Sequence, residues 1–235
     1  MKKNVPIWDL PLRIFHWLLV LSVVGAYITG TLGGNLTIWH ERFGGLILGL
    51  LIFRVLWGFV GSEHARFSSF FPTPKRIIAY FKGQWTGIGH NPVGALAIIT
   101  LLATLTVQVS TGLFANDDIA FEGPLFHLVD KEVSDKLTGL HSRSFDFLLV
   151  VIAIHVSAIF FYQWVKKADL VLPMLTGKKS IPKALATHDF QPARKLRFVL
   201  SFLVATTVVW GVWRGDFVNY LQPLASIQIV STAHT

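Results

Sequence analysis

Two histidines, His141 and His155, stand fourteen residues apart on one strongly apolar segment of the chain. On an α-helix this spacing returns both side chains to nearly the same face and separates them by about 21 Å along the axis. Ionisable side chains are costly inside a membrane, and where they occur they usually serve a function. Two of them on one face, at two depths, predict two stacked sites with a path between them.

The composition places the chain in a membrane. Of its 235 residues, 52% are hydrophobic and only 14% are charged, and the mean hydropathy is +0.55. These values are too apolar for a soluble domain of this length. The absence of cysteine excludes disulfides, thiolate metal sites, iron–sulfur clusters and covalently attached c-type haem. The nine histidines are therefore the leading soft metal ligands.

Five apolar stretches have the length that a bilayer requires, and they predict an all-α integral membrane bundle. They cover roughly residues 12–31, 41–61, 92–115, 143–165 and 196–213. The first follows Lys2 and Lys3, as in a signal peptide, but Arg13 and His16 interrupt it, so we expect a retained helix. Tryptophans near the ends of these stretches indicate an interfacial aromatic belt. They are Trp8, Trp17, Trp39, Trp57, Trp164, Trp210 and Trp213.

The positions of lysine and arginine predict the orientation in the membrane. The N-terminal tail, residues 54–92 and residues 165–198 hold three, five and eight of the 21 basic residues. This places the N-terminus in the cytoplasm and the C-terminus outside, with the acidic 116–140 loop also outside. The basic segments 74–85 and 166–195 either lie on the anionic inner leaflet or form solvated loops. Because the net charge of +8 follows membrane sidedness instead of forming one patch, nucleic-acid binding is excluded.

Depth along the predicted helices sorts four histidines into two pairs. His40 opens the second span and His141 opens the fourth, so both lie at the outer face. His16 lies about two turns into the first span from the inside, and His155 lies about three turns from the inner end of the fourth. The crossed pairings would have to join opposite sides of the membrane. Each pair therefore links the fourth helix to a different partner, which suits a planar cofactor held from both faces within a bundle.

Glycine and arginine residues accompany the histidines. Gly44 and Arg54 share one helical stripe with His40. Gly44 leaves room for a large flat ligand, and Arg54 faces the bundle near the depth of the inner pair. A buried arginine needs an anion, and a haem propionate would serve. The other arginines that could contact a propionate are Arg13, beside His16, and Arg42 and Arg143, which flank the outer pair.

Simpler explanations stay open for these residues. A single intramembrane histidine can hydrogen-bond a backbone carbonyl, Arg54 can snorkel to the interface, and the glycines can serve close helix packing. The remaining histidines fall in loops or tails, where a solvated role is expected; they are His64, His90, His127, His188 and His234. His64 also competes as an inner ligand. No catalytic constellation is found, since the zinc-protease motif that begins at His40 requires a second histidine where Gly44 stands.

Two histidines on opposite faces of one haem iron fill its axial positions, which suits electron transfer instead of oxygen activation. Two such haems with irons about 20 Å apart would carry electrons across much of the bilayer. Quinone is the mobile redox carrier of membranes, so electron exchange with quinol at one face is the simplest hypothesis. The acidic outer loop offers a docking surface for a basic partner.

Short pieces of sequence, spread from the first span to beyond the fourth, form a recognisable set. They are residues 8–9, 13–17, 40–44, 54–67, 89–92, 111–114 and 173–178, together with His141 and His155. With these pieces, residues 6–180 resemble the prokaryotic cytochrome b561 family, which is related to the b-type cytochrome subunits of nickel–iron hydrogenases. The resemblance implies a four-helix core that binds two haem b groups, with the fourth helix supplying one ligand to each.

We therefore expect residues 1–180 to form a di-haem four-helix domain. Residues 181–235 should add a cytoplasmic connector, a fifth transmembrane helix and an outer tail. The leading functional hypothesis is a cytochrome that transfers electrons between the quinone pool and a periplasmic redox protein, either a c-type cytochrome or a hydrogenase. Its expected partners are membrane lipid, quinone and that redox protein.

Two other functions compete. The first is a quinone oxidoreductase of the superoxide oxidase type that acts without a partner protein, which leaves open whether the chain is an enzyme in its own right. The second is a histidine-based metal or proton transporter. A homodimer is a further open alternative.

Overall fold

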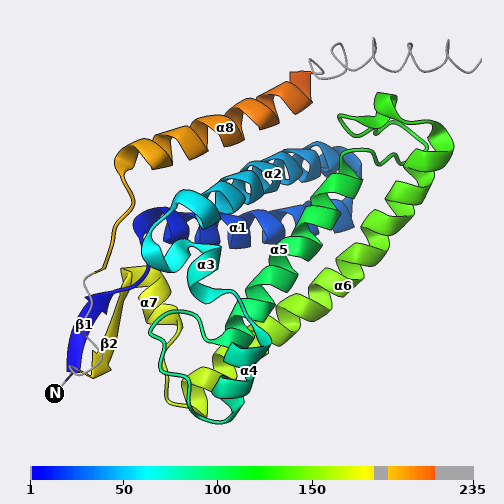
Figure 1. Cartoon of the computed structure of the whole chain (residues 1–235). Helices are drawn as coiled ribbons and strands as arrows, with labels where there is room; N and C mark the ends of the chain where they lie inside the picture. Colours follow the sequence, from blue (N-terminus) through cyan, green and yellow to red (C-terminus); the bar gives the residue numbers. More distant parts are fainter. Residues whose placement is uncertain (1, 183–189, 215–235) are drawn as a thin grey trace, which may run out of the picture.

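The computed structural model describes residues 2–182 and 190–214 (Figure 1). Within them, five helices are long and apolar enough to cross a membrane. These are α1 (Leu10–Leu32), α2 (Thr37–Val60), α5 (Pro92–Gly112), α6 (Lys131–Trp164) and α8 (Lys195–Arg214). The predicted all-α membrane bundle is confirmed. His188, His234 and the predicted outer tail lie outside the described residues.

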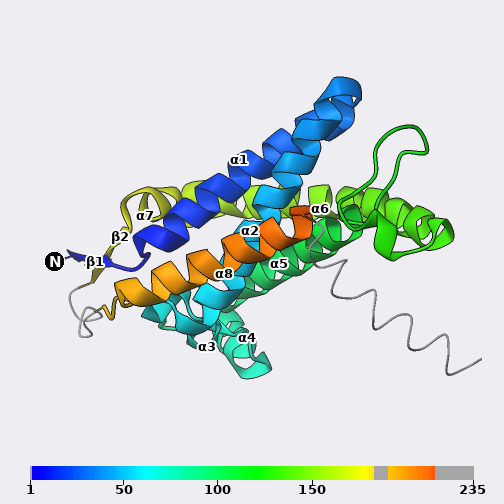
Figure 2. The same ribbon diagram turned by 90° about the horizontal axis from the view of Figure 1, so that it is seen from above.

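The long helices form two hairpins. The first packs α1 against α2 and the second packs α5 against α6, while α2 joins the hairpins by packing against α5. The fifth long helix, α8, lies along the outside of α2 (Figures 1 and 2). The predicted four-helix core therefore consists of α1, α2, α5 and α6, and α8 is an addition to its surface.

Side-chain caps set where these helices begin. The carboxylate of Asp9 accepts a hydrogen bond from the backbone N–H of Leu12 at 2.8 Å, and that of Asp130 accepts one from Val133 at 2.8 Å. The cap at Asp130 starts α6 at Lys131, twelve residues before the predicted span at 143. The prediction followed only the apolar residues, whereas the polar first three turns continue the same helix beyond the apolar layer.

A two-stranded antiparallel sheet was not predicted. It pairs β1 (Lys2–Pro6) with β2 (Lys178–Pro182), and the proposed domain boundary at residue 180 falls within β2. Next to the sheet, the carbonyl of Gly177 accepts hydrogen bonds from the backbone N–H groups of Ile7 and Trp8 at 2.8 and 3.2 Å. The sheet thereby fixes the N-terminal end of α1.

Short elements close the two ends of the bundle. One end, called here the basic end, carries β1, β2, α3 (Phe67–Phe70), α4 (Pro74–Phe81) and α7 (Val171–Thr176), with the one-turn helix η2 (Glu63–Ala65) (Figure 1). The opposite end, called the acidic end, carries the 113–130 loop with η3 (Phe126–Leu128), and the turn between α1 and α2 contains η1 (Gly34–Leu36).

Trp57 differs from the predicted interfacial belt. It is 1% exposed, and its indole N–H donates to the carboxylate of Asp9 at 2.9 Å. Its ring stacks on Phe53, with ring centres 5.6 Å apart. The prediction placed Trp57 among membrane anchors because it lies near the end of a span, but its polar N–H pairs with the cap of α1 instead of with water. Trp57 is thus a core residue that joins α1 to α2.

Candidate functional site

The structure brings His40 and His141 together at the acidic end of the core. Their ring centres are 6.0 Å apart and the ring planes are nearly perpendicular, at 86°. Metal–imidazole nitrogen bonds are about 2 Å long, so two imidazoles on opposite sides of one metal need ring centres about 6 Å apart. The observed separation matches that requirement.

Hydrogen bonds fix which nitrogen of each ring is free. Nδ1 of His40 lies 2.8 Å from the carbonyl oxygen of Ala26, and Nδ1 of His141 lies 2.8 Å from that of Gln108. A carbonyl only accepts, so both Nδ1 atoms carry the hydrogen and donate. This leaves Nε2 of each ring as the ligating nitrogen, oriented by a bond of the kind that supports metal-bound histidines.

Each of these rings lies against a glycine of the neighbouring helix. A Cβ atom added to Gly30 would lie 2.6 Å from Nδ1 of His40, and one added to Gly112 would lie 2.9 Å from Cε1 of His141. Real Cβ atoms do not approach other atoms that closely, so only glycine permits these ring positions. Neither glycine can be recognised from the sequence, because nothing but the ring contact distinguishes these two residues from packing glycines.

The amide of Gln108 contacts the free nitrogen of His141. Its Nε2 lies 3.1 Å from Nε2 of His141 and donates to it, while its Oε1 accepts from the hydroxyl of Ser144. For His141 to bind a metal through Nε2, this amide must turn away. Gln108 therefore lies directly beside the candidate ligating nitrogen, and no pattern in the sequence distinguishes it.

The second predicted pair is His16 and His155, whose imidazoles are near enough to interact electrostatically. Both are half-buried, and Nδ1 of His16 is sealed from solvent without a hydrogen-bond partner. The helices that carry them, α1 and α6, are not among the pairs whose backbones pack closely. Because α6 is continuous from Lys131 to Trp164, its two histidines are separated by about 21 Å of rise.

The candidate arginines occupy different surroundings. Arg54 is 2% exposed, its guanidinium lies over the ring of Phe67 at 4.7 Å, and its Nη1 has no hydrogen-bond partner. Asp9 is the acidic residue that interacts with it electrostatically. Arg13 donates from Nη1 to the carbonyl of Leu175 at the end of α7, while its Nε is buried without a partner.

Arg42 and Arg143 are both exposed, and Arg42 lies over the ring of Trp39 at 4.8 Å. Gly44 faces open space, because an added Cβ would meet no atom within 4 Å. The space beside Gly44 is consistent with the predicted room for a flat ligand next to His40. The two exposed arginines can reach a ligand only by changing side-chain conformation.

The donor set fits haem. Within residues 2–182 and 190–214 no three histidine, aspartate or glutamate side chains gather around one point as metal ligands. Instead, the imidazoles of His40 and His141 lie together as a pair. Haem supplies four equatorial nitrogens of its own, so two axial imidazoles complete its coordination. His16 with His155, and His40 with His141, are the pairs that would hold such a group.

Comparison with known proteins agrees with this donor set. The family profile of prokaryotic cytochrome b561 matches residues 7–177. No solved structure matches the chain. Among curated relatives, the probable Ni/Fe-hydrogenase B-type cytochrome subunit of Azotobacter vinelandii is 30% identical over 142 residues, which cover 47% of this chain and 58% of the relative.

The probable Ni/Fe-hydrogenase 1 B-type cytochrome subunit of Escherichia coli K12 is 24% identical over 137 residues, covering 45% of this chain and 57% of the relative. The chain thus spans less than two thirds of the length of these relatives. The family match extends over most of the chain and includes all four histidines. The chain belongs to the prokaryotic cytochrome b561 family, and it is a multi-pass membrane b-type cytochrome whose cofactor is haem b.

Proposed function

We propose that this member of the cytochrome b561 family binds two haem b groups and transfers electrons across the membrane between the quinone pool and a redox protein at its acidic end. The observation that carries the proposal is the pair of His40 and His141, with ring centres 6.0 Å apart and both Nδ1 atoms engaged by backbone carbonyls. The outer ligands are these two residues, and the inner ligands are His16 and His155.

The chain's own residues hold and orient these imidazoles. Backbone carbonyls of Ala26 and Gln108 keep the outer rings in one tautomer, and Gly30 and Gly112 allow the rings to lie against the neighbouring helices. Haem b held by two imidazoles supplies reversible one-electron chemistry without an open position for a substrate. Arg54 and Arg13 carry buried guanidinium nitrogens without partners, which suits them to a nearby propionate.

The acidic end offers a surface for a basic redox protein. Asp117 accepts backbone N–H bonds from Ile119, Ala120 and Phe121 at 3.0, 2.9 and 2.8 Å. These bonds hold the pKa of Asp117 below its usual range, so its charge persists in mild acid. Ile119, at the tip of the same turn, is 90% exposed. An exposed apolar tip beside fixed negative charge supports docking of a positively charged protein.

The related hydrogenase cytochrome subunits suggest a hydrogenase as that partner, and a c-type cytochrome is the other candidate. We place the basic end in the cytoplasm and the acidic end in the periplasm of a bacterial inner membrane, following the lysine and arginine bias. Residues 1–180 then form the haem-binding domain and residues 181–235 the accessory part. The absence of a three-ligand cluster in residues 2–182 and 190–214 weighs against a metal transporter.

The test uses purified, haem-loaded protein in lipid vesicles. Decyl-ubiquinol should reduce the b-type α-band, and a basic c-type cytochrome added outside should reoxidise it. His40→Ala should still be reduced by the quinol but should lose transfer to the added cytochrome. Trp164→Phe, an exposed substitution at the opposite end of α6, should behave as wild type. If superoxide alone reduces quinone through the protein, at a rate that the added cytochrome does not change, the result would instead support the partner-free oxidoreductase.

A further inference from the structure

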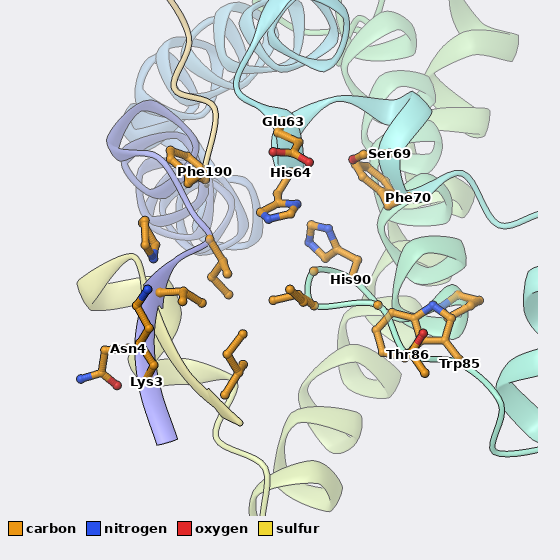
Figure 3. A pocket seen from close by; sticks show the side chains of 18 of the residues that line it. Lys3, Asn4, Glu63, His64, Ser69, Phe70, Trp85, Thr86, His90 and Phe190 are labelled. Carbon is orange, nitrogen blue, oxygen red and sulfur yellow. The ribbon is translucent and has the colours of Figure 1, made fainter. Parts of the chain in front are cut away.

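Two hollows in the molecule differ in their surroundings. One lies at the basic end, has a volume of about 750 Å³ and is lined by polar side chains that include Glu63, His64 and His90 (Figure 3). The other has a volume of about 560 Å³ and runs along the outside of the core. Residues within 11–18 of α1, 42–53 of α2 and 198–213 of α8 line this second hollow, which is called here the α8 groove.

The α8 groove follows from the way in which three helices pack. Both α1 and α8 pack against α2, but their backbones do not pack closely against each other, and Figure 2 shows them on either side of α2. Cβ atoms added to Gly45 and Gly49 of α2 would lie 2.9 Å from the ring of Trp213 and 3.2 Å from a methyl group of Val209. The indole N–H of Trp213 also donates to Glu41 at 2.7 Å. Because α8 is fixed on α2, the gap towards α1 is part of the fold.

Nearly all residues that line the groove are apolar, for example Phe15, Leu18, Leu46, Phe202 and Val209. Leu18, Leu46 and Phe202 are 40%, 45% and 53% exposed, so the groove opens to the surroundings of the protein. For a multi-pass membrane protein those surroundings are lipid chains, which are as apolar as leucine. An unfilled groove would lose dispersion contacts along its walls, so a lipid chain is the expected occupant.

The dimensions of the groove match one lipid chain. Its lining on α2 runs from Arg42 to Phe53, which is eleven residues, or about 16 Å of rise. One leaflet contributes about 15 Å, half of a hydrocarbon layer of about 30 Å. A volume of about 560 Å³ over that length leaves a mean cross-section of about 35 Å². A helix about 10 Å across needs about 80 Å², so the groove is too narrow for a helix of a partner protein.

Arg42 lies at the acidic end of the groove and is the one charged residue among the described residues that line it. It is two residues from His40, or about 200° around the helix axis, so it points away from the outer histidine pair. Its guanidinium lies 4.8 Å from the ring centre of Trp39. The guanidinium of Arg214 lies 4.7 Å from the ring centre of Trp210, which also lines the groove. A guanidinium stacked on a ring keeps the N–H groups at its edge available for an anion.

The charge on these two arginines is not balanced by the protein. The lysines at the acidic end, Lys131 and Lys136, form ion pairs with carboxylates. In residues 2–182 and 190–214, by contrast, no carboxylate lies within ion-pair distance of Arg42 or Arg214. A lipid whose chain enters the groove from this end would place its phosphate beside both guanidinium groups. Guanidinium and phosphate form strong charge-assisted hydrogen bonds, often two at a time.

We propose that the α8 groove binds one anionic glycerophospholipid, with an acyl chain along α2 and the phosphate hydrogen-bonded by Arg42 and Arg214. An anionic head group is favoured, since a zwitterionic one would bring an ammonium group next to the two arginines. The bound lipid would bridge α1 and α8 and so help to hold α8 on the core. The proposal does not depend on electron transfer, because the groove lies on the face of α2 opposite to His40.

Native mass spectrometry of the haem-loaded protein, released from detergent micelles with added phosphatidylglycerol, tests the charged end of the site. Wild type should retain one such lipid per chain and bind it more tightly than phosphatidylcholine with the same acyl chains. Arg42→Gln should weaken binding about tenfold, which corresponds to about 1.4 kcal/mol. Lys136→Gln removes an exposed positive charge at the same end and is the matched control, which should bind as wild type.

A second pair of variants tests the groove itself. Thr206 and Thr207 are adjacent exposed residues of α8, and of these two only Thr206 lines the groove. Thr206→Trp should fill the groove and abolish retention of the lipid. Thr207→Trp places the same side chain outside the groove and should retain phosphatidylglycerol as wild type does.

Three results would overturn the proposal. The first is equal retention of phosphatidylglycerol in wild type, Arg42→Gln and Thr206→Trp. The second is equal retention of phosphatidylglycerol and phosphatidylcholine in wild type. The third is a lipid-free dimer that Thr206→Trp disrupts, which would place a second copy of the chain in the groove. If Thr206→Trp does not fold, the comparison of Arg42→Gln with Lys136→Gln decides.

Discussion

Replacing Gly30 with alanine should displace the outer haem while leaving the inner one in place. The added Cβ would lie 2.6 Å from Nδ1 of His40, about 0.8 Å inside ordinary van der Waals contact. A ring shift of that size lengthens the 2.8 Å bond to the Ala26 carbonyl to the limit of hydrogen bonding. Overpacking and the lost bond together cost roughly 3 kcal/mol, or about a hundredfold in haem affinity.

Alanine substitutions at two further glycines allow the loss of haem to be compared with the closeness of the added Cβ. At Gly112 the added Cβ would lie 2.9 Å from the ring of His141, and at Gly139 it would lie 3.5 Å from the flexible end of Arg143. Haem content per chain, measured as the pyridine haemochrome, should fall most in Gly30→Ala, less in Gly112→Ala and not at all in Gly139→Ala. Two haems with an unchanged spectrum in Gly30→Ala would refute the placement of His40 as a ligand.

Other consequences follow from the same geometry. His155→Ala should remove one haem and leave the other bound, and His40→Ala should remove the outer one; full haem content in His155→Ala would contradict the inner pairing. Trp57→Phe removes the 2.9 Å bond to Asp9 in a residue that is 1% exposed, so thermal unfolding should shift by the equivalent of about 1–3 kcal/mol, against no shift for the exposed Trp164→Phe. Burial lowers the pKa of His90 to about 3, so the unfolded chain binds more protons than the folded one below pH 6.5. The free energy of unfolding should therefore fall as the pH is lowered from 6.5 to about 3. In His90→Phe, the free energy of unfolding should depend less on pH over this range. If its pH dependence is unchanged, groups other than His90 determine it.

The long helices could be predicted from the sequence because a membrane demands apolar runs of fixed length. The start of α6 could not, since its first turns are polar and depend on the Asp130 cap. The β1–β2 pairing also escaped prediction, because two short polar strands about 175 residues apart carry no local signal. Local patterns therefore predicted the elements that the bilayer dictates and missed those that tertiary contacts create.

The histidine site was also predicted only in part from the sequence. Helical spacing and depth predicted that His40 would lie near His141, and the structure places the two rings 6.0 Å apart. The pairing of His16 with His155, and the role of all four histidines as ligands, stay predictions. The residues that hold the outer rings, Gly30, Gly112 and Gln108, act through contacts between helices that no spacing rule describes. Likewise His90 is a loop histidine in the sequence, and only the fold places it beside His64 in the wall of one cavity and near the charge of Arg54.

The central claim is that two imidazole pairs at two depths each hold one haem. The most direct test is the number and spin state of haems per purified chain, from the pyridine haemochrome together with electron paramagnetic resonance of the oxidised protein. We expect two low-spin haems with two imidazole ligands each in wild type, and one such haem in each of His40→Ala and His155→Ala. A single haem in wild type, or a high-spin haem with an open axial position, would contradict it.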